Sequence, residues 1–574
     1  MDYTKEIKKF FKGDVDTTEE TLIKYSHDAS VFEIKPEVVV YPKDNEDLIK
    51  LVKWVNDNKI NYPNLAITMR AAGTCMSGGA IGESIIVDTT RYLNKIKNIK
   101  NVTPFKIFPK YPNSFPVEIT GEITVEPGCF YRDFEKVTLE KDLLLPCYTA
   151  SKSLNAVGGM VGNNSAGEKT LLYGKTEDYV KELKVIFSDG YEYTIKPLTK
   201  QEFISKIAIP GLEGEIYRNI FEMINNHKSL INSAKPNVSK NSAGYYLWNI
   251  WNEEEQVFDL TKLIVGSQGT LGIVTEIKFH LVSVKKQSKL AVIFMKDISQ
   301  LGSLVDRILP FAPESIESYD DATMKLAIRF FPDFLKKKGT WGMIKFMFSF
   351  IPEALMMLTF GMPKLILLVE FAGNDKKTLK NKAEKLLSSI SDMKYKTRIT
   401  RNDNDANKYW DIRRESFALL RKHIKDKHTA PFIDDIVVRP EFLPEFLPKL
   451  NKILDQYPIT YTIAGHAGNG NFHIIPLMDF SDPKTTEIII ELSKSVYDLV
   501  LEYDGSITAE HNDGIIRTPF LKQMYGEEIY KLFVSTKNIF DKNNIFNPGK
   551  KVGGSIEYIK NHIIKESHIK IHNS

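Results

Sequence analysis

Residues 70–79 read Arg70-Ala71-Ala72-Gly73-Thr74-Cys75-Met76-Ser77-Gly78-Gly79. They follow the short apolar run 66–69 and precede the run 85–87, so we expect a loop between two strands. Small residues there let successive backbone N–H groups approach an anion closely. The spacing fits neither G-x-G-x-x-G nor G-x-x-x-x-G-K-[ST], which argues against a Rossmann fold and a P-loop.

Two more glycine-rich clusters follow in the same half of the chain. Residues 151–167 contain Gly158-Gly159, and residues 266–276 contain Gly266, Gly269 and Gly272. Any one cluster is better explained by ordinary turns. Three clusters in one domain favour a long phosphorylated cofactor that lies against the backbone.

A histidine pair marks the second half of the chain. Residues 464–473 read Ala464-Gly465-His466-Ala467-Gly468-Asn469-Gly470-Asn471-Phe472-His473, between apolar runs at 461–464 and 472–477 that predict strands. Asn469-Gly470 is typical of a tight hairpin turn, which would bring His466 and His473 together. With Glu510 downstream, two imidazoles and a carboxylate suit Zn²⁺, with Mn²⁺ and Fe²⁺ as alternatives. A glycine-rich hairpin with two unrelated histidines is the competing interpretation.

Composition narrows the class of protein. A chain of 574 residues is too long for one hydrophobic core, so two or three domains are expected. The net charge of +4 gives no electrostatic case for nucleic-acid binding. Cys75, Cys129 and Cys147 form no C-x-x-C pair, which disfavours a disulfide framework or an iron–sulfur cluster and favours a reducing cytoplasm. The first 13 residues are charged and do not resemble a signal peptide.

The pattern of the chain changes near residue 285. Before it, short β-rich runs alternate with glycine-rich turns, and apolar spacing predicts a helix over 45–58. The expected strands of this half are 38–41, 85–88, 123–125, 183–187, 263–265 and 273–274. After residue 285 we expect strands over 290–294 and 365–371 and helices over 376–390, 440–455 and 485–503. The lysine-, isoleucine- and histidine-rich tail from residue 555 to 574 is interpreted as a peripheral extension.

An apolar, methionine-rich segment lies within residues 330–363. Lys345, Pro352 and Glu353 interrupt it, so it falls short of the roughly 20 apolar residues that a spanning helix needs. One hypothesis is an interfacial helix pair that contacts a membrane peripherally, with Trp341 at the boundary. The favoured hypothesis is a buried insertion or a subunit contact.

Six motifs occur here in the order found in one flavoenzyme family. They are Arg70-Ala-Ala-Gly73-Thr74, the stretch from Gly158-Gly159 to Tyr173-Gly174, residues 266–276, the His466–His473 hairpin, Glu510-His511 and Asn547-Pro548-Gly549-Lys550. In this the chain resembles the FAD-linked D-2-hydroxyacid dehydrogenases of the vanillyl-alcohol oxidase and p-cresol methylhydroxylase (PCMH) superfamily. The resemblance spans roughly residues 30 to 550. Each motif alone is weak evidence for the family, whereas six motifs in the same order are strong evidence.

The resemblance implies an α+β protein of two domains. A PCMH-type FAD-binding domain would span 35–284, after an N-terminal extension over 1–34. An α/β substrate (cap) domain with an antiparallel sheet would span 285–545 and carry the apolar insertion. Residues 546–574 would return to the flavin and then form the tail.

The resemblance also implies where a noncovalent FAD would bind, since no histidine or cysteine matches a covalent flavin link. The implied cofactor residues are Arg70, Ala72, Gly73, Thr74, Cys75, Met76, Ser77, Pro146, Thr149, Ser153, Gly158, Gly159, Asn163, Gly266, Gly269, Gly272, Ile273 and Asn547.

For the chemistry, the resemblance assigns His466, His473 and Glu510 to a divalent metal, zinc being favoured. His511 would be the catalytic base, and Arg413 would pair with the substrate carboxylate. An isolated helix-surface charge for Arg413 and a structural loop histidine for His511 are the alternatives that the residues alone leave open.

Two departures from the family pattern bear on substrate. Asn469 replaces the usual acid of the hairpin turn, and Ile475 stands where hydroxyglutarate-specific members tend to carry an amide, which favours a small or apolar substrate side chain. The expected reaction is FAD-dependent oxidation of D-lactate or another small 2-hydroxy acid. Electrons would pass to a cytochrome, a quinone or an iron–sulfur partner, in the cytoplasm or at the inner face of the membrane. A glycolate oxidase-like subunit, a D-2-hydroxyglutarate dehydrogenase and, less favoured, a non-redox alkyl-glycerone-phosphate synthase-like enzyme are the alternatives.

Overall fold

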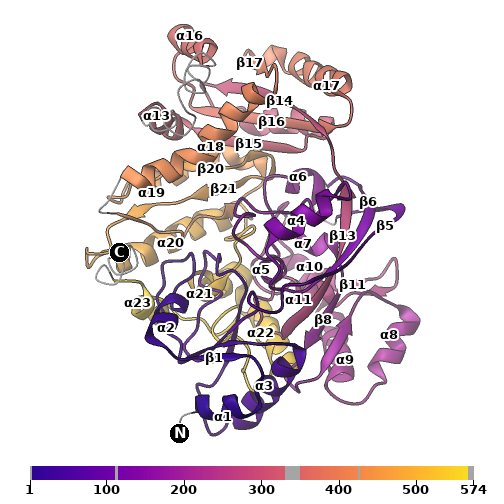
Figure 1. Cartoon of the computed structure of the whole chain (residues 1–574). Coiled ribbons are helices and arrows are strands. Elements are labelled where there is room, and N and C mark those ends of the chain that lie inside the picture. The colour runs from indigo at the N-terminus through magenta and orange to yellow at the C-terminus, as the bar shows by residue number, and fades with distance from the viewer. Residues whose placement is uncertain (1–2, 110–113, 330–349, 424–426, 566–574) are drawn as a thin grey trace.

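The computed structural model describes residues 3–109, 114–329, 350–423 and 427–565. Helices and predominantly antiparallel sheets are mixed along the chain, so the α+β prediction is confirmed. In Figure 1 the N-terminal half forms the lower part of the molecule, and a second sheet with its helices forms the upper part.

A small sheet opens the lower part. Its order is β1-β2-β4-β3, in which β2, β4 and β3 run parallel and β1 pairs antiparallel with β2. Helix α3 (Asn45–Asn58) follows β2 and buries Leu48, Leu51, Val52 and Val55, the apolar positions whose spacing predicts it. The bounds are β1 (Asp14–Asp16), β2 (Val38–Tyr41), β3 (Ile67–Arg70) and β4 (Ile85–Asp88). The first glycine loop therefore begins where β3 ends.

The larger sheet of the lower part has β13 (Ile273–Ser283) near its centre, in the order β5-β6-β13-β8-β9, with β7 also on β13. Alternate residues of β13 are buried, including Ile273, Ile277 and Phe279, because one face packs on a core. The other strands are β5 (Ile96–Ile107), β6 (Val117–Val125), β7 (Leu143–Leu144), β8 (Val180–Ile186) and β9 (Glu192–Ile195). Helices of this part include α1 (Tyr3–Phe10), α2 (Glu19–Tyr25), α4 (Tyr131–Leu139), α5 (Val157–Asn163), α8 (Lys200–Ile207), α9 (Leu212–Asn226), α10 (Lys228–Ala234) and α22 (Leu521–Phe540).

The upper sheet is antiparallel throughout, in the order β17-β14-β16-β15-β20-β21-β19. Both faces are covered, which explains the uninterrupted apolar run of β14 (Gln287–Met295). Ala291 and Ile293 belong to one core, whereas Val292 and Phe294 belong to the other. The remaining strands are β15 (Ser315–Asp320), β16 (Leu365–Gly373), β17 (Lys396–Ile399), β19 (Ile436–Val437), β20 (Ile463–His466) and β21 (Asn471–Ile474). The helices are α12 (Leu301–Ile308), α13 (Asp321–Arg329), α17 (Lys376–Ser389), α18 (Asp403–His423), α19 (Leu443–Leu454) and α20 (Thr485–Glu502).

One predicted strand is wrong. Residues 263–265 do not pair in a sheet but fall at the end of the short helix α11 (Thr261–Ile264). Asp259 accepts hydrogen bonds from the backbone and hydroxyl of Thr261, and Gly266 leaves the helix with a φ of +85°. A short apolar run bounded by such residues fits either structure by periodicity alone.

That the tail from residue 555 is peripheral stays a prediction, but its described part, residues 555–565, is attached to the rest of the chain. Ser555 caps helix α23 (Ile556–His562), whose Ile559 is fully buried. Ile563 then forms a β-bridge with Phe32. Ile559 and Ile563 belong to the same core as Val31 and Phe32, so this end of the chain packs onto the N-terminal segment.

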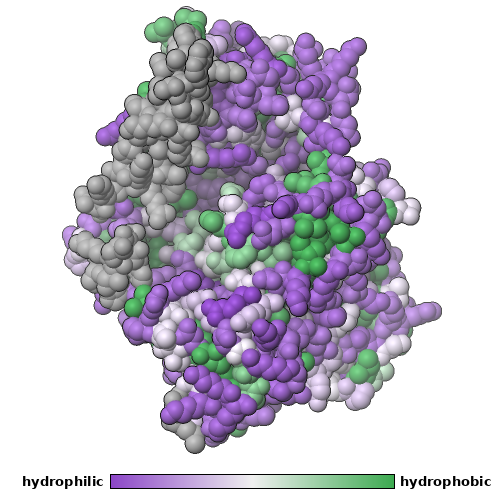
Figure 2. All heavy atoms as spheres, in the orientation of Figure 1, coloured by the Kyte–Doolittle hydropathy of each residue, from purple (hydrophilic) through white to green (hydrophobic). Residues whose placement is uncertain are grey.

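The apolar insertion is described only from residue 350 onward, since residues 330–349 lie outside the described residues. Helix α16 (Ile351–Phe360) is anchored by buried Glu353, which contacts Lys408 and Tyr409, while Leu358 is 83% exposed. Membrane contact and subunit contact both stay predictions. Within the described ranges no helix has the length and apolarity needed to span a bilayer. The face in Figure 2 is mostly hydrophilic, with separate hydrophobic patches.

Candidate active site

A cavity of about 750 Å³ lies where the three glycine clusters and the upper sheet meet. Its lining includes Ala464, His466, His473 and Ile475 from the region of β20 and β21, and Arg413 from α18. The cavity therefore joins the histidine hairpin to the glycine loops, which lie far apart in the sequence. The predicted cofactor residues that line it are Arg70, Ala72, Gly73, Thr74, Cys75, Met76, Thr149, Gly158, Gly159, Asn163, Gly269 and Gly272.

The other predicted cofactor residues lie outside the cavity lining, and Ser77, Asn547 and Gly266 among them bond to segments that line it or flank it. Ser77 donates to the carbonyl of His511 at 3.2 Å. Asn547 donates to the carbonyls of Gly79 and Gln268 at 2.9 and 2.7 Å, so it ties the first and third glycine loops together. Pro146 and Ile273 are buried, Ser153 is exposed, and Gly266 accepts a hydrogen bond from Asn512.

The glycine loops fit a long cofactor held against backbone. A Cβ atom at Gly162 would meet nothing within 4 Å, and one at Gly159 would meet only Ala71, at 3.6 Å. Both glycines line the cavity, so their backbone is open toward its space. The volume falls within the range of roughly 300–1,000 Å³ that small-molecule and cofactor sites occupy.

The histidine hairpin forms as predicted. Strands β20 and β21 pair antiparallel, with Ala464 opposite His473 and His466 opposite Asn471. The turn contains a 3₁₀ segment over Ala467–Asn469, and Gly470 takes a φ of +69°. The centroids of the two imidazole rings lie 5.2 Å apart, and the ring planes meet at an angle of 87°.

Both rings direct Nε2 at one carboxylate oxygen. Oε1 of Glu510 lies 3.4 Å from Nε2 of His466 and 3.3 Å from Nε2 of His473. The Nδ1 of His473 lies 2.9 Å from the carbonyl of Asp434, which accepts only, so Nδ1 carries a proton and the neutral ring presents a lone pair at Nε2. The Nδ1 of His466 lies 2.6 Å from the buried carboxylate of Glu317. When both rings are neutral, their Nε2 lone pairs converge with the carboxylate oxygen and fit a cation, and the Nδ1 contacts are those that metal-bound histidines make.

Lys240 balances the charge of the carboxylate. This lysine is fully buried, and its Nζ lies 3.0 Å from Oε2 of Glu510. Burial would raise the pKa of Glu510, but Lys240 and His466 hold that pKa well below its usual range. Glu510 is therefore an ionised ligand candidate, with one oxygen toward the histidines and the other on the lysine.

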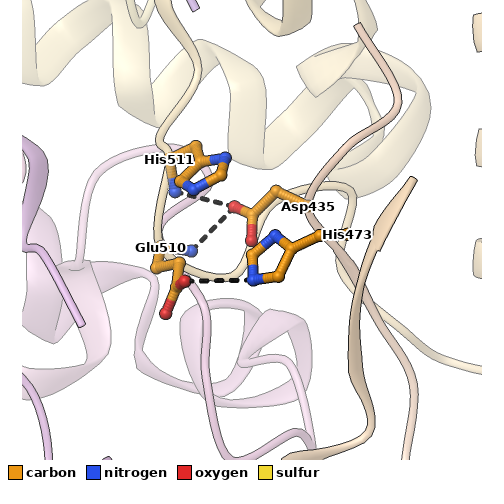
Figure 3. A group of neighbouring side chains, drawn as sticks. All are labelled: Asp435, His473, Glu510 and His511. Carbon is orange, nitrogen blue, oxygen red and sulfur yellow. Dashed lines mark hydrogen bonds and ion pairs between the residues drawn. The ribbon is translucent and has the colours of Figure 1, made fainter. Parts of the chain in front are cut away.

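Figure 3 shows a neighbouring group of Asp435, His473, Glu510 and His511, in which one potential ligand atom of each lies within 4.8 Å of the others. Asp435 is already saturated. Its Oδ2 accepts from the backbone N–H groups of residues 509, 510 and 511 and from Thr508, at 2.7 to 2.9 Å, and its Oδ1 accepts from Asn471. We therefore assign Asp435 to shaping the loop and not to metal ligation.

His511 is oriented by a second aspartate. Its Nδ1 lies 2.7 Å from Oδ2 of Asp434, and fully buried Arg517 pairs with the other oxygen of that carboxylate. The ring stacks on His473 with centroids 5.2 Å apart. Burial alone would lower the pKa of His511, but Asp434 and then Asp435 raise it to about 9. The ring nitrogen that Asp434 leaves unused is Nε2.

Arg413 lines the cavity, as its predicted role requires, but it also has a partner that the sequence does not indicate. Its guanidinium pairs with Glu317, the same carboxylate that holds His466. Its Nε is buried and has no hydrogen-bond partner. A buried donor without a partner is unfavourable, so the hydrogen bonds of this guanidinium are incomplete in the fold.

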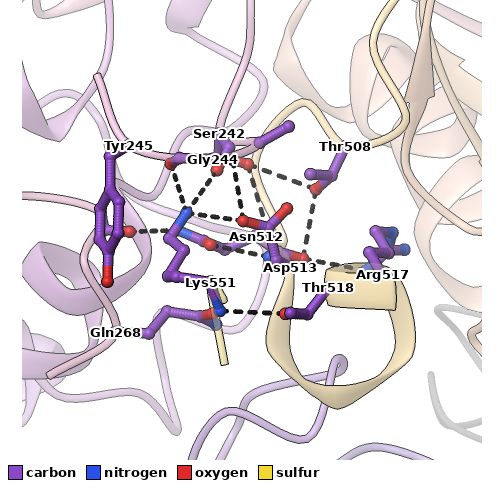
Figure 4. Close-up of polar contacts among 12 residues, drawn as sticks. Ser242, Gly244, Tyr245, Gln268, Thr508, Asn512, Asp513, Arg517, Thr518 and Lys551 are labelled. Carbon is purple, nitrogen blue, oxygen red and sulfur yellow. Dashed lines mark hydrogen bonds and ion pairs between the residues drawn. The ribbon is translucent and has the colours of Figure 1, made fainter. Parts of the chain in front are cut away.

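The loop that carries Glu510 and His511 is attached to the glycine clusters (Figure 4). Asn512, at a φ of +67°, donates to the carbonyls of Asn163 and Gly266, and Gln268 accepts from the backbone of Gly514. Gln268 of the third cluster thus has a structural role. These bonds fix the loop relative to the cofactor side of the cavity.

A buried ion pair completes this attachment, and it gives a stability prediction. Fully buried Lys551 contacts Asp513 at 2.8 Å and donates to the carbonyls of Ser242 and Gly244. Asp513→Ala should lower the free energy of unfolding by about 3–5 kcal/mol, because it leaves a buried charge without its partner. Chemical denaturation of the purified protein measures this. Asp498→Ala, at an exposed pair with Lys494, is the matched control and should cost under about 1 kcal/mol.

Comparisons with known proteins agree with this architecture. The fold is similar to that of p-cresol methylhydroxylase, with a TM-score of 0.63 at 14% identity over 96% of both chains. It is also similar to that of alkyldihydroxyacetonephosphate synthase, with a TM-score of 0.62 at 15% identity over 95% of this chain and 84% of that one. The fold is therefore of the PCMH type, as the resemblance implies.

Family models match two regions of the chain. Residues 36–196 match the FAD binding domain, and residues 284–551 match the C-terminal domain of FAD linked oxidases. The chain belongs to the FAD-linked oxidases.

The relatives with curated names are distant in sequence. D-2-hydroxyglutarate dehydrogenase of Escherichia coli is 25% identical over 94% of this chain. The match covers 50% of that relative, so this chain spans about half of its length. Glycolate oxidase subunit GlcD of Bacillus subtilis is 25% identical over 92% of this chain and 91% of that protein. D-lactate dehydrogenase of Archaeoglobus fulgidus is 22% identical over 90% of this chain and 91% of that protein.

Proposed function

We propose that this protein is an FAD-dependent dehydrogenase that oxidises a small D-2-hydroxy acid, with D-lactate favoured, to the 2-oxo acid. The proposal depends on one observation above all. His466, His473, Glu510 and His511 line the same cavity as the glycine loops of the FAD-binding domain. Electrons would pass to an acceptor other than oxygen, such as a cytochrome, a quinone or an iron–sulfur protein.

Two groups from outside the chain belong to the proposal. Noncovalent FAD, held by the glycine loops, would supply the acceptor for the hydrogen that leaves C2. A divalent cation, zinc being favoured, would be held by His466, His473 and Glu510 and would stabilise negative charge on the substrate hydroxyl oxygen.

The chain's own residues supply binding and proton transfer. In its neutral form, whose share grows as the pH rises toward its raised pKa of about 9, His511 takes the hydroxyl proton on Nε2, while Asp434 holds Nδ1 and so fixes the ring and its tautomer. Arg413, which lines the cavity, would pair through its guanidinium with the substrate carboxylate. Ile475 and Ala464 line the cavity beside His473, and their apolar side chains suit a short substrate side chain.

Anaerobic titration tests the proposal directly. D-lactate should bleach the flavin absorbance of the purified protein, and L-lactate should leave it unchanged. The panel should include glycolate, D-2-hydroxybutyrate, D-malate and D-2-hydroxyglutarate, because named relatives act on glycolate or D-2-hydroxyglutarate. If no member of the panel reduces the flavin, the dehydrogenase proposal is wrong.

A further inference from the structure

A second guanidinium lies beside Arg413 at the cavity. Arg414 also lines the cavity and lies over the ring of Trp410, 4.9 Å from its centroid. Its Nη2 contacts both carboxylate oxygens of Glu168, at 2.9 Å each. Glu168 lines the cavity as well, so an ion pair forms part of the cavity wall.

The sequence neighbours of both partners place this pair near the proposed metal site. Gly167, next to Glu168, has its carbonyl 3.4 Å from Nζ of Lys240, which pairs with Glu510. Arg413, next to Arg414, pairs with Glu317, which holds His466. The Arg414–Glu168 pair therefore connects helix α18 of the upper part with a loop of the FAD-binding part, close to the reacting centre.

The two arginines differ in how firmly they are held. Arg413 is only 11% exposed and its partner Glu317 is buried, so this pair is part of the interior. The side chain of Arg414 is 52% exposed and that of Glu168 is 19% exposed, so solvent or a ligand reaches the outer pair. A half-exposed pair in contact with water is weak enough for a competing carboxylate to replace one partner.

We propose that Glu168 occupies the position on Arg414 that a second carboxylate of the substrate would otherwise take. This inference rests on the proposed function. A guanidinium is the preferred partner of a carboxylate, and Arg413 is already assigned to the carboxylate next to C2. A 2-hydroxy dicarboxylate would have to displace Glu168 from Arg414 and would also be repelled by it. Glu168 thus selects monocarboxylic 2-hydroxy acids against dicarboxylic ones.

The test is the substrate preference of Glu168→Gln, measured on the flavin-loaded protein. The amide keeps the shape of the side chain and removes its charge, so Arg414 becomes available. The ratio of kcat/KM for D-malate or D-2-hydroxyglutarate to that for D-lactate should rise at least about threefold, as expected for a half-exposed charge. The double variant Glu168→Gln/Arg414→Gln should lose the gain. Glu502→Gln, at the exposed pair with Lys449, is the matched control and should leave the ratio unchanged.

The outcomes separate this inference from the proposed function. If the parent protein oxidises D-lactate but the ratio in Glu168→Gln rises less than threefold, or if the parent prefers a dicarboxylate, the role of Glu168 is wrong. If neither parent nor variant is reduced by any 2-hydroxy acid, the proposed function itself fails. Glu168→Ser removes the same charge and replaces Glu168→Gln should that variant lose its flavin.

Discussion

Replacing His511 with alanine should lower the rate of flavin reduction by D-lactate by about a hundredfold to ten-thousandfold, the contribution typical of a general base. The geometry supports this size of effect. Asp434 holds Nδ1 at 2.7 Å, and the stacked ring of His473 restricts rotation, so the remaining nitrogen is fixed in position. Rapid-mixing measurement of anaerobic flavin reduction gives the rate, and the ratio of flavin to protein shows whether the cofactor stays bound.

Two further variants locate the effect. Asp434→Asn should lower the rate less than His511→Ala, because Asp434 positions the ring and does not contact the substrate. Exposed His227 bonds only to its own helix, so His227→Ala should leave the rate unchanged. Near-normal flavin reduction in His511→Ala would show that another group takes the proton.

Local patterns in the sequence predict much of the fold. The helix expected over 45–58 has those bounds in the structure, and the one expected over 376–390 ends one residue earlier, at Ser389. Both have apolar residues at helical spacing that bury one face, so sequence and packing agree. The short run 263–265 lacks such a period. Its conformation is decided by Asp259 and Gly266 at its ends.

The same distinction applies to the site. His466 and His473 are seven positions apart, and a turn motif predicts that they meet. Glu317 is 149 residues from His466 and Lys240 is 270 residues from Glu510, and no local period indicates either partner. Glu317 reaches His466 because β15 pairs with β20 in a register that sets Ser318 opposite Gly465. Such a register depends on the assembled sheet, so a charged residue within a strand is the only signal that the sequence offers for Glu317.

Loss of the proposed metal site should have the second large effect. His473→Ala removes a ligand, so metal affinity should fall by more than the roughly 10–100-fold that loss of a residue supporting a ligand costs. Elemental analysis of the purified protein should then find little metal, and D-lactate should no longer reduce the bound flavin. His473 is preferable to Glu510 for this test, because removing Glu510 also leaves Lys240 buried without its carboxylate and destabilises the fold.

A variant of Glu317 should have a smaller effect on metal binding, because Glu317 contacts the ligand His466 and is not itself one of the proposed ligands. Glu317→Gln weakens the hold on Nδ1 of His466, so metal affinity should fall about 10–100-fold, less than in His473→Ala; it also removes the charge that pairs with Arg413, so metal content and not turnover is the measurement for this variant. A chelator applied to the parent protein is the independent measurement: it should abolish turnover while the flavin stays bound, and added Zn²⁺ or Mn²⁺ should restore it. A parent protein that is free of metal and fully active would refute the metal site. The two histidines would then share a proton with Glu510, since only a proton or a cation stabilises two Nε2 atoms within 3.4 Å of one carboxylate oxygen.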